Sequence, residues 1–292
     1  MTASPFFDAP TPRTGKFLRG LDIVCGCGLV LLLGLGIHAL AQTGQLRGEL
    51  WAPFLEPALW RLIGRGFAAT LRALIACTLL SFVAGLLLAA LGSAGPRWLR
   101  TPLRLWVELF RAIPSLLILL FVFFTYAEAF NRIGVTLANG LGDTAAMVLG
   151  LDQLQTLGPL IVALTLYHGA LCAEIIRAGL NAIPRGQMQA ARALGMTSSQ
   201  AVRLILLPQA LHHMRPALLA EAVRIAKATA LGYAIGYQEL LRTGQIISTA
   251  FHNVIAVSLV MMLIYGCLCG ALSWLASSLA RTTPGGRLGS AS

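Results

Sequence analysis

Ionisable side chains lie inside apolar segments of this chain and recur at helical spacing. Glu108 and Arg111 are three residues apart, and a second segment repeats the spacing with Glu221, Arg224 and Lys227. Residues three apart share one face of a helix, so each set forms one charged patch. An unpaired charge at the bilayer centre costs about 2.5–3.5 kcal/mol, so such groups normally face a water-filled path or the interior of the helix bundle. Both sets predict a path for a zwitterionic solute, and Glu108 with Arg111 equally predicts a structural ion pair.

The segments that hold these charges are predicted to be membrane helices. The chain has 292 residues, of which 57% are hydrophobic and 11% charged, a balance unlike that of soluble domains. Several charge-free runs meet or nearly meet the roughly 20 residues that a helix needs to cross a bilayer. They are Ile23–Leu46, Ala73–Pro96, Ala112–Ala127, Gln153–Ala173 and Thr243–Ala280. With a less apolar span over Ala217–Tyr237, we expect an all-α integral membrane protein with about six transmembrane helices.

The net charge of +11 is explained by membrane topology. Arginine and lysine gather at the ends of apolar runs and form no basic stripe with aromatic residues, so nucleic acid is not an expected partner. With a cytoplasmic N-terminus, thirteen basic residues lie in inside segments against five outside, as the positive-inside rule requires. The five outside residues are Arg47, Arg61, Arg65, Arg132 and Arg242.

A polar stretch interrupts the apolar sequence over residues 173–208, AEIIRAGLNAIPRGQMQAARALGMTSSQAVRLILLP. Good helix formers over Gln187–Leu194 predict a short helix, and Gly195 predicts a break after it. We expect Ser198 and Ser199 to cap a second helix, which Pro208 then disturbs. Small residues around the break would let this elbow enter a groove on a partner protein.

The order of residues in this stretch resembles the cytoplasmic EAA loop of ABC importer permeases, which docks on an ATPase. The residues that flank the Gln189-Ala190-Ala191 core of the loop resemble the polar amino acid permease subfamily. They are Glu174 and Gly179 on the N-terminal side and Pro208-Gln209-Ala210 on the C-terminal side. Gln189 replaces the family's acidic residue, so an expected charge pair becomes a neutral hydrogen bond. The ATPase-coupling residues that the resemblance implies are Gly186, Gln189, Ala190, Ala191, Gly195, Ile205, Leu207 and Pro208.

Two further stretches extend the resemblance. Glu108-x-x-Arg111-x-x-Pro114, in a third span expected over residues 101–130, is similar to the family's E-x-x-R-G-T-P. The run from Lys227 to Leu231 is similar to K-D-T-S-L, with Ala228 in place of the acidic residue, which favours an acidic solute over a cationic one. The expected substrate-path residues are Glu108, Arg111, Pro114, Arg224, Lys227 and Thr229. His168, inside another span, is expected to be a hydrogen-bonded core histidine.

The resemblance implies a five-helix permease core plus an extra N-terminal helix. The expected divisions are a cytoplasmic tail (1–20), an anchor helix with an external loop (21–59), the permease transmembrane domain (60–281) and a C-terminal tail (282–292). The coupling loop occupies residues 183–208, and residues 128–157 are expected to form an external loop with a short amphipathic or re-entrant piece.

The implied function is that of a permease subunit of an ATP-driven ABC importer for polar amino acids, with glutamate or a related acidic or amide amino acid as the favoured solute. Its expected place is the bacterial cytoplasmic (inner) membrane. The expected partners are an ABC ATPase dimer, a second permease chain, identical or a sister, an extracytoplasmic amino-acid-binding protein and the lipid bilayer.

Sequence motifs for catalysis are missing from this chain, including the nucleotide-binding G-x-x-x-x-G-K-[ST] loop, H-E-x-x-H and G-x-S-x-G. A separate subunit is therefore expected to hydrolyse ATP. The six cysteines lack the spacing of a zinc site, so no metal and no cofactor are expected. The alternatives are a permease for phosphonates or osmoprotectants, an ion-coupled secondary transporter, which works without an ATPase, and a membrane-bound enzyme.

Overall fold

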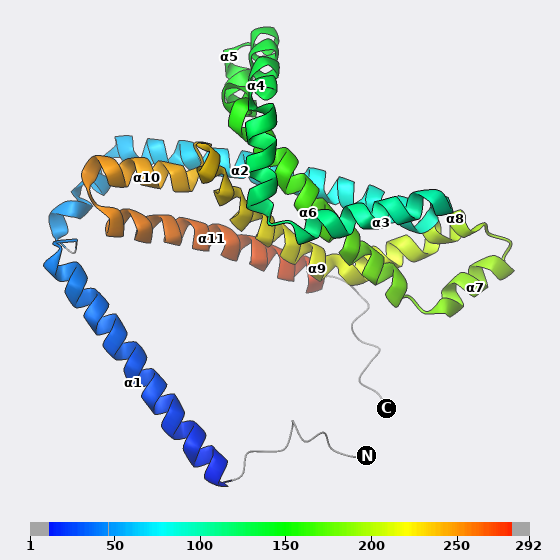
Figure 1. Cartoon of the computed structure of the whole chain (residues 1–292), viewed down its shortest axis with the longest axis horizontal. Helices are drawn as coiled ribbons and strands as arrows, with labels where there is room; N and C mark the ends of the chain where they lie inside the picture. Colours follow the sequence, from blue (N-terminus) through cyan, green and yellow to red (C-terminus); the bar gives the residue numbers. More distant parts are fainter. Residues whose placement is uncertain (1–11, 46, 282–292) are drawn as a thin grey trace.

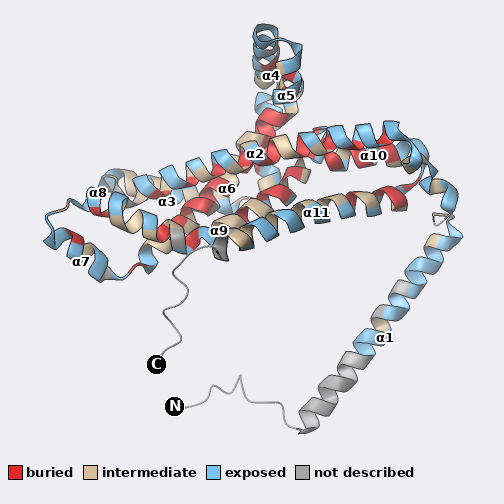
Figure 2. Ribbon diagram, turned by 180° about the vertical axis from the view of Figure 1, so that it is seen from behind, coloured by how far each residue is buried: buried red, intermediate tan, exposed pale blue. Residues whose placement is uncertain are grey.

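The computed structural model describes residues 12–45 and 47–281, and this part of the chain is helical and contains no strand. The N-terminal helix α1 (Pro12–Gln42) extends away from the other helices (Figure 1), and no residue of its apolar segment whose burial is described is buried (Figure 2). α1 begins inside the stretch expected to be a tail, so residues 12–20 are helical. The rest of that tail and the C-terminal tail (282–292) lie outside the described residues.

Long helices pack side by side to form the main bundle (Figure 1). They are α2 (Pro57–Ala94), α6 (Leu154–Ala182), α9 (Leu207–Ala228) and α11 (Val254–Arg281), with the shorter α10 (Leu240–Phe251) beside α2 and α11. α2 and α6 approach closely, because a Cβ on Gly85 would lie 2.4 Å from the Cβ of Cys172. A short 3₁₀ helix, η1 (Gly48–Leu55), leads from α1 into α2.

The third span expected over residues 101–130 is wrong, because the helix breaks at Pro114. α3 (Arg97–Ala112) ends there and α4 (Ser115–Leu141) begins, with Ile113 extended at φ −76° and ψ 131°. Proline has no backbone N–H and disfavours helical geometry in the residue before it, so the two segments turn apart. α3 lies along the bundle, whereas α4 leaves it at a steep angle (Figure 1).

The external loop expected over residues 128–157 is largely helical. α4 continues to Leu141, and α5 (Asp143–Leu149) and the 3₁₀ turn η2 (Leu151–Gln153) follow before α6 begins. Gly142 and Gly150 make the turns at each end of α5 with φ values of 82° and 73°, which favour glycine. The short helical piece expected in this region is α5.

Among the described residues, 5 helices are long and apolar enough to cross a membrane. They contain Val24–Gln42, Pro57–Gly92, Ser115–Leu141, Leu151–Ala182 and Val254–Ser278. The sixth expected span is helical, as α9 followed by the 3₁₀ helix η4 (Thr229–Ile235), but it is absent from this apolar set and carries Glu221, Arg224 and Lys227. The all-α membrane fold is confirmed.

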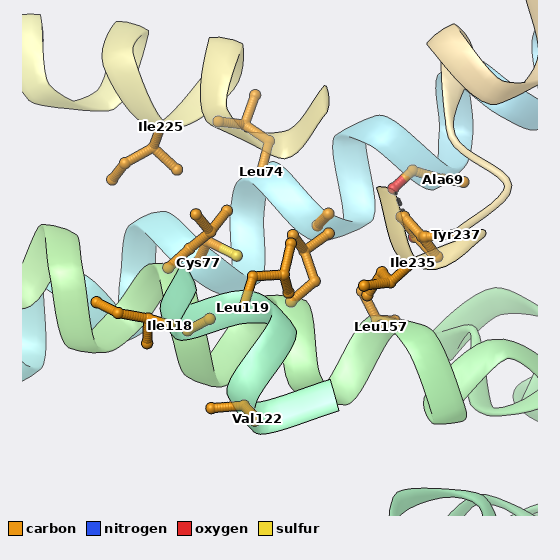
Figure 3. Packing of buried hydrophobic residues seen from close by; sticks show 14 of the residues in the cluster. Ala69, Leu74, Cys77, Ile118, Leu119, Val122, Leu157, Ile225, Ile235 and Tyr237 are labelled. Carbon is orange, nitrogen blue, oxygen red and sulfur yellow. Dashed lines mark hydrogen bonds between the residues drawn. The ribbon is translucent and has the colours of Figure 1, made fainter. Parts of the chain in front are cut away.

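The main core forms where α2, α4, α6 and α9 meet η4 (Figure 3). Leu119 on α4 and Leu160 and Leu164 on α6 are fully buried in it. The hydroxyl of Tyr237 donates to the carbonyl of Ala69 at 2.8 Å, which fixes the segment after η4 to α2. This contact holds the charged helix α9 and its extension against the bundle.

Candidate functional site

The polar stretch between α6 and α9 forms an elbow of two short helices, as expected from the sequence. α7 (Arg185–Ala193) and α8 (Ser198–Ala201) are separated by a turn in which Gly195 has φ +78°. A side chain with a Cβ adopts this left-handed geometry only with strain. The space around Gly195 is open, because a Cβ built there meets nothing within 4 Å. Backbone geometry, rather than crowding within the chain, therefore favours glycine here.

The predicted cap of the second helix is wrong by one residue. Thr197, and not Ser198 or Ser199, caps α8: its hydroxyl oxygen accepts from the Gln200 backbone N–H at 3.3 Å. In return, the Gln200 side-chain oxygen accepts from the Thr197 backbone N–H at 2.9 Å, which completes a capping box. Ser198 instead accepts from Arg192 across the elbow at 3.3 Å.

Pro208 disturbs the second helix, as expected. Residues Val202–Leu206 form a wider π-helical turn between α8 and α9. Pro208 lacks the N–H that an α-helix would donate to the carbonyl four residues earlier, so the wider turn accommodates it. The chain then continues as α9, and the elbow is joined directly to the helix that carries the charged cluster.

The predicted coupling residues fall into two groups, one buried or half-buried and the other exposed. Ala191 is buried, and Ile205 and Leu207 are half-buried, so these three side chains face other parts of this chain. The exposed residues are Gly186, Gln189, Ala190, Gly195 and Pro208. Leu194 is 80% exposed beside Gly195, and the sequence did not single it out. An apolar side chain this exposed at the turn is a further candidate for contact with a partner.

A buried carboxylate links α6 to α9. Oε1 of Glu221 lies 2.6 Å from Nδ1 of His168, and both side chains are buried. Oε2 of the same carboxylate accepts from Nε of Arg224 at 2.5 Å. The prediction that His168 is a hydrogen-bonded core histidine is confirmed. The sequence did not identify Glu221 as its partner, which lies 53 residues away.

The side chain of Arg224 is 57% exposed although its carboxylate partner is buried. Lys227 is exposed three residues further along α9, so both cations lie on one face of the helix. Lys227 forms no ion pair within the described residues. Thr229 is buried, and its hydroxyl donates to the Ala226 carbonyl at 2.8 Å. The part of the predicted substrate path that lies on α9 therefore offers the solute two exposed cations, Arg224 and Lys227.

Glu108 and Arg111 form no ion pair in the described part of the chain, although they share α3. Both are exposed, and Arg111 lies at the end of α3 just before the break at Pro114. Glu108 instead lines a cavity of about 30 Å³ with the ion pair formed by Arg177 and Glu174. Nη2 of Arg177 donates to Glu174 Oε2 at 2.7 Å. The alternative of a structural Glu108–Arg111 pair is wrong.

Residues 81–283 match the family described as "Binding-protein-dependent transport system inner membrane component". The glutamate transport system permease protein GluD of Corynebacterium glutamicum is 35% identical over 249 residues, which are 85% of each chain. The glutamate/aspartate import permease protein GltK of Escherichia coli is 31% identical over 223 residues, which cover 75% of this chain and 92% of GltK.

Solved structures show the same fold. A permease chain from the crystal structure of an amino acid ABC transporter with histidines superposes with a TM-score of 0.63 at 26% identity. The superposition covers 76% of this chain and 94% of that chain.

Proposed function

The chain belongs to the family of binding-protein-dependent transport system inner membrane components, and we propose that it imports glutamate or a related acidic or amide amino acid. It is a multi-pass ABC permease subunit of the inner membrane and is not itself an enzyme, since a separate ATPase hydrolyses ATP in this family. Members of the family work with an ATPase and a solute-binding protein.

The observation that carries the solute assignment is the exposed cationic face of α9. Arg224 is held by a buried carboxylate and Lys227 is unpaired within the described residues, while Ala228 offers no acidic group beside them. Charge-assisted hydrogen bonds from these cations would stabilise a carboxylate. A cationic amino acid would find no exposed acidic partner on this face. The names of GluD and GltK agree with this preference.

A second permease chain, identical or a sister, is proposed to complete the path. In the second half of α9, from residue 217 to its end, the exposed residues recur along one stripe, namely Ala217, Ala220, Arg224 and Lys227. These positions are three or four apart and so form one face, which the other helices of this chain leave uncovered. Two such faces would enclose a polar path between the chains. Charged side chains in a membrane normally require this kind of enclosure.

The elbow formed by α7 and α8 is proposed to dock on one ATPase of a dimer. Exposed small residues, Ala190 and Gly195, permit close approach, and exposed Leu194 supplies apolar contact. Gln189 is exposed and neutral, so it would contribute a hydrogen bond rather than a charge pair. Because the elbow leads directly into α9, movement of the ATPase would be transmitted to the cationic face.

A solute panel tests the proposed substrate class. The permease would be reconstituted in proteoliposomes with its ATPase and binding protein, and uptake of labelled L-glutamate would be challenged with unlabelled solutes. Glutamate, glutamine and aspartate are expected to compete, whereas L-arginine, methylphosphonate and glycine betaine are not. Competition by methylphosphonate or glycine betaine alone would instead identify a permease for phosphonates or osmoprotectants.

A further inference from the structure

A second polar cavity, of about 520 Å³, lies away from the coupling elbow and from the α9 cations. Its walls come from α2, from α5 with η2, and from the start of α10. α2 and α10 lie side by side in the bundle, and α5 lies beside α4, the helix that leaves the bundle (Figure 1). The α2 residues that line the cavity belong to the first half of that helix, which is the half farther from α7 (Figure 1) and the outer half in the predicted topology. The volume of the cavity is in the range of small-molecule binding sites.

One wall of the cavity supplies cations. Arg65 and Arg72 both line it and are seven residues apart on α2, about two helical turns, so they share a face. The two guanidinium groups differ in the contacts that they make within the chain. Nη1 of Arg72 donates to the carbonyl of Met147 at 2.8 Å and so fixes the end of α5. Arg65 is exposed and makes no hydrogen bond or ion pair with any residue in the described ranges.

Another wall supplies a carboxylate and an amide. Asp152, on η2, lines the cavity and forms no ion pair within the described residues. Oε1 of the neighbouring Gln153 is buried without a hydrogen-bond partner there. A buried acceptor left without a donor is unfavourable, so this oxygen is expected to bind water or a ligand. Gln238 adds a second, exposed amide.

We propose that this cavity is an outer binding site for a zwitterionic α-amino acid, an inference that rests on the function proposed above. Arg65 binds the α-carboxylate, since its guanidinium offers paired donors that match two carboxylate oxygens. Asp152 accepts hydrogen bonds from the α-ammonium group. Gln153 and Gln238 can each donate to or accept from a side-chain carboxylate or amide. The site would hold the solute before it reaches Arg224.

Ligand-observed saturation-transfer NMR on the permease–ATPase complex in nanodiscs, without binding protein, tests the site. L-glutamate is expected to bind the wild type, and Arg65→Gln and Asp152→Asn should each weaken binding by about ten- to a hundredfold, as for a lost charge-assisted hydrogen bond. Arg61→Gln is the matched control, because Arg61 is exposed one turn away on α2 and does not line the cavity. Complex yield and basal ATP hydrolysis would confirm that every variant assembles.

Binding of N-acetyl-L-glutamate tests the proposed role of Asp152, because this compound keeps both carboxylates of glutamate and lacks the α-ammonium group. The wild type should discriminate against it, and Asp152→Asn should lose that discrimination. Unchanged glutamate binding in Arg65→Gln and Asp152→Asn, or no binding to the wild type, would overturn the proposed site. If these variants bind glutamate normally but respond poorly to the binding protein, the cavity is part of a protein-docking surface instead. Amino acid uptake by the wild type establishes the proposed function independently of these results.

Discussion

Nδ1 of His168 on α6 and Oε1 of Glu221 on α9 are 2.6 Å apart, and both side chains are buried. Glu221 also holds Arg224, which projects to the surface of the chain. One carboxylate therefore joins a helix–helix contact in the core to a cation on the exposed face of α9. Substitution of Glu221 therefore tests the stability of the protein, and substitution of Arg224 tests its selectivity for the solute.

Glu221→Ala is expected to destabilise the protein. It leaves His168 without its hydrogen-bond partner and Arg224 without its carboxylate, and breaking a buried pair in this way typically lowers stability by about 3–5 kcal/mol. Glu128→Ala is the matched control, since Glu128 pairs with Arg132 at an exposed site worth about 0–1 kcal/mol. Thermal unfolding of the purified permease should show a clearly lower midpoint for Glu221→Ala only. Equal midpoints would contradict a structural role for Glu221.

Arg224→Gln is expected to impair transport with little effect on stability. The arginine side chain is 57% exposed, and Glu221 keeps its bond to His168 after the substitution. Loss of a charge-assisted hydrogen bond to the solute should raise the KM for glutamate by about ten- to a hundredfold. Arg224→Lys should recover part of this loss because it restores the charge. Uptake kinetics in proteoliposomes measure the effect, with Arg132→Gln as the exposed control.

The same experiment distinguishes a path residue from a purely structural one. If Arg224 only stabilises the fold, Arg224→Gln should lower the melting midpoint and the yield of complex without changing the KM of the molecules that assemble. A normal KM combined with reduced yield would therefore remove Arg224 from the substrate path.

Gly195→Asp is expected to abolish ATP-driven uptake while the chain still folds. An L-residue at φ +78° is strained by about 1–2 kcal/mol, and the new carboxylate lies on the exposed turn of the elbow. Gly140→Asp provides the control, because Gly140 is exposed, has open space around it and has no positive φ. Co-purification with the ATPase and uptake should both be lost only for Gly195→Asp. Wild-type uptake in this variant would exclude docking through the elbow.

Cysteine labelling tests the topology that the basic residues predict. In a cysteine-free background, cysteines at Arg47 and Asp143 should react with an impermeant reagent added outside intact spheroplasts. A cysteine at Ala190 should react only after the membrane is opened, because the elbow is predicted to be cytoplasmic. All three positions are exposed in the structure, so access through the membrane decides the result. Labelling of position 190 from outside would reverse the topology.

The sequence predicted the elbow more accurately than it predicted the long helices. Gly195 and Pro208 act through the backbone of their own neighbourhood, so the break and the disturbed turn followed from residue type alone. The same rule for proline was available at Pro114, but the apolar residues on both sides favoured one continuous span. The structure breaks the helix there, which moves Glu108 and Arg111 to α3, outside the apolar span of α4.

Contacts between distant segments could not be predicted from spacing. His168 and Glu221 are 53 residues apart, and their bond depends on how α6 packs against α9. The helical spacing of Glu221 and Arg224 did predict two residues on one face, and the structure joins them. Arg65 and Asp152 are likewise brought to one cavity by the fold, although the sequence placed Arg65 only in an outside segment and Asp152 only in the expected external loop.

Dependence of uptake on ATP tests the central claim most directly. Proteoliposomes would contain the permease with its ATPase and receive the binding protein outside and ATP inside, and labelled glutamate uptake would be measured without any ion gradient. The account predicts uptake that requires ATP, the ATPase and the binding protein together, and that stops with a non-hydrolysable nucleotide. Uptake by the permease alone, driven by a proton or sodium gradient and indifferent to ATP, would contradict it.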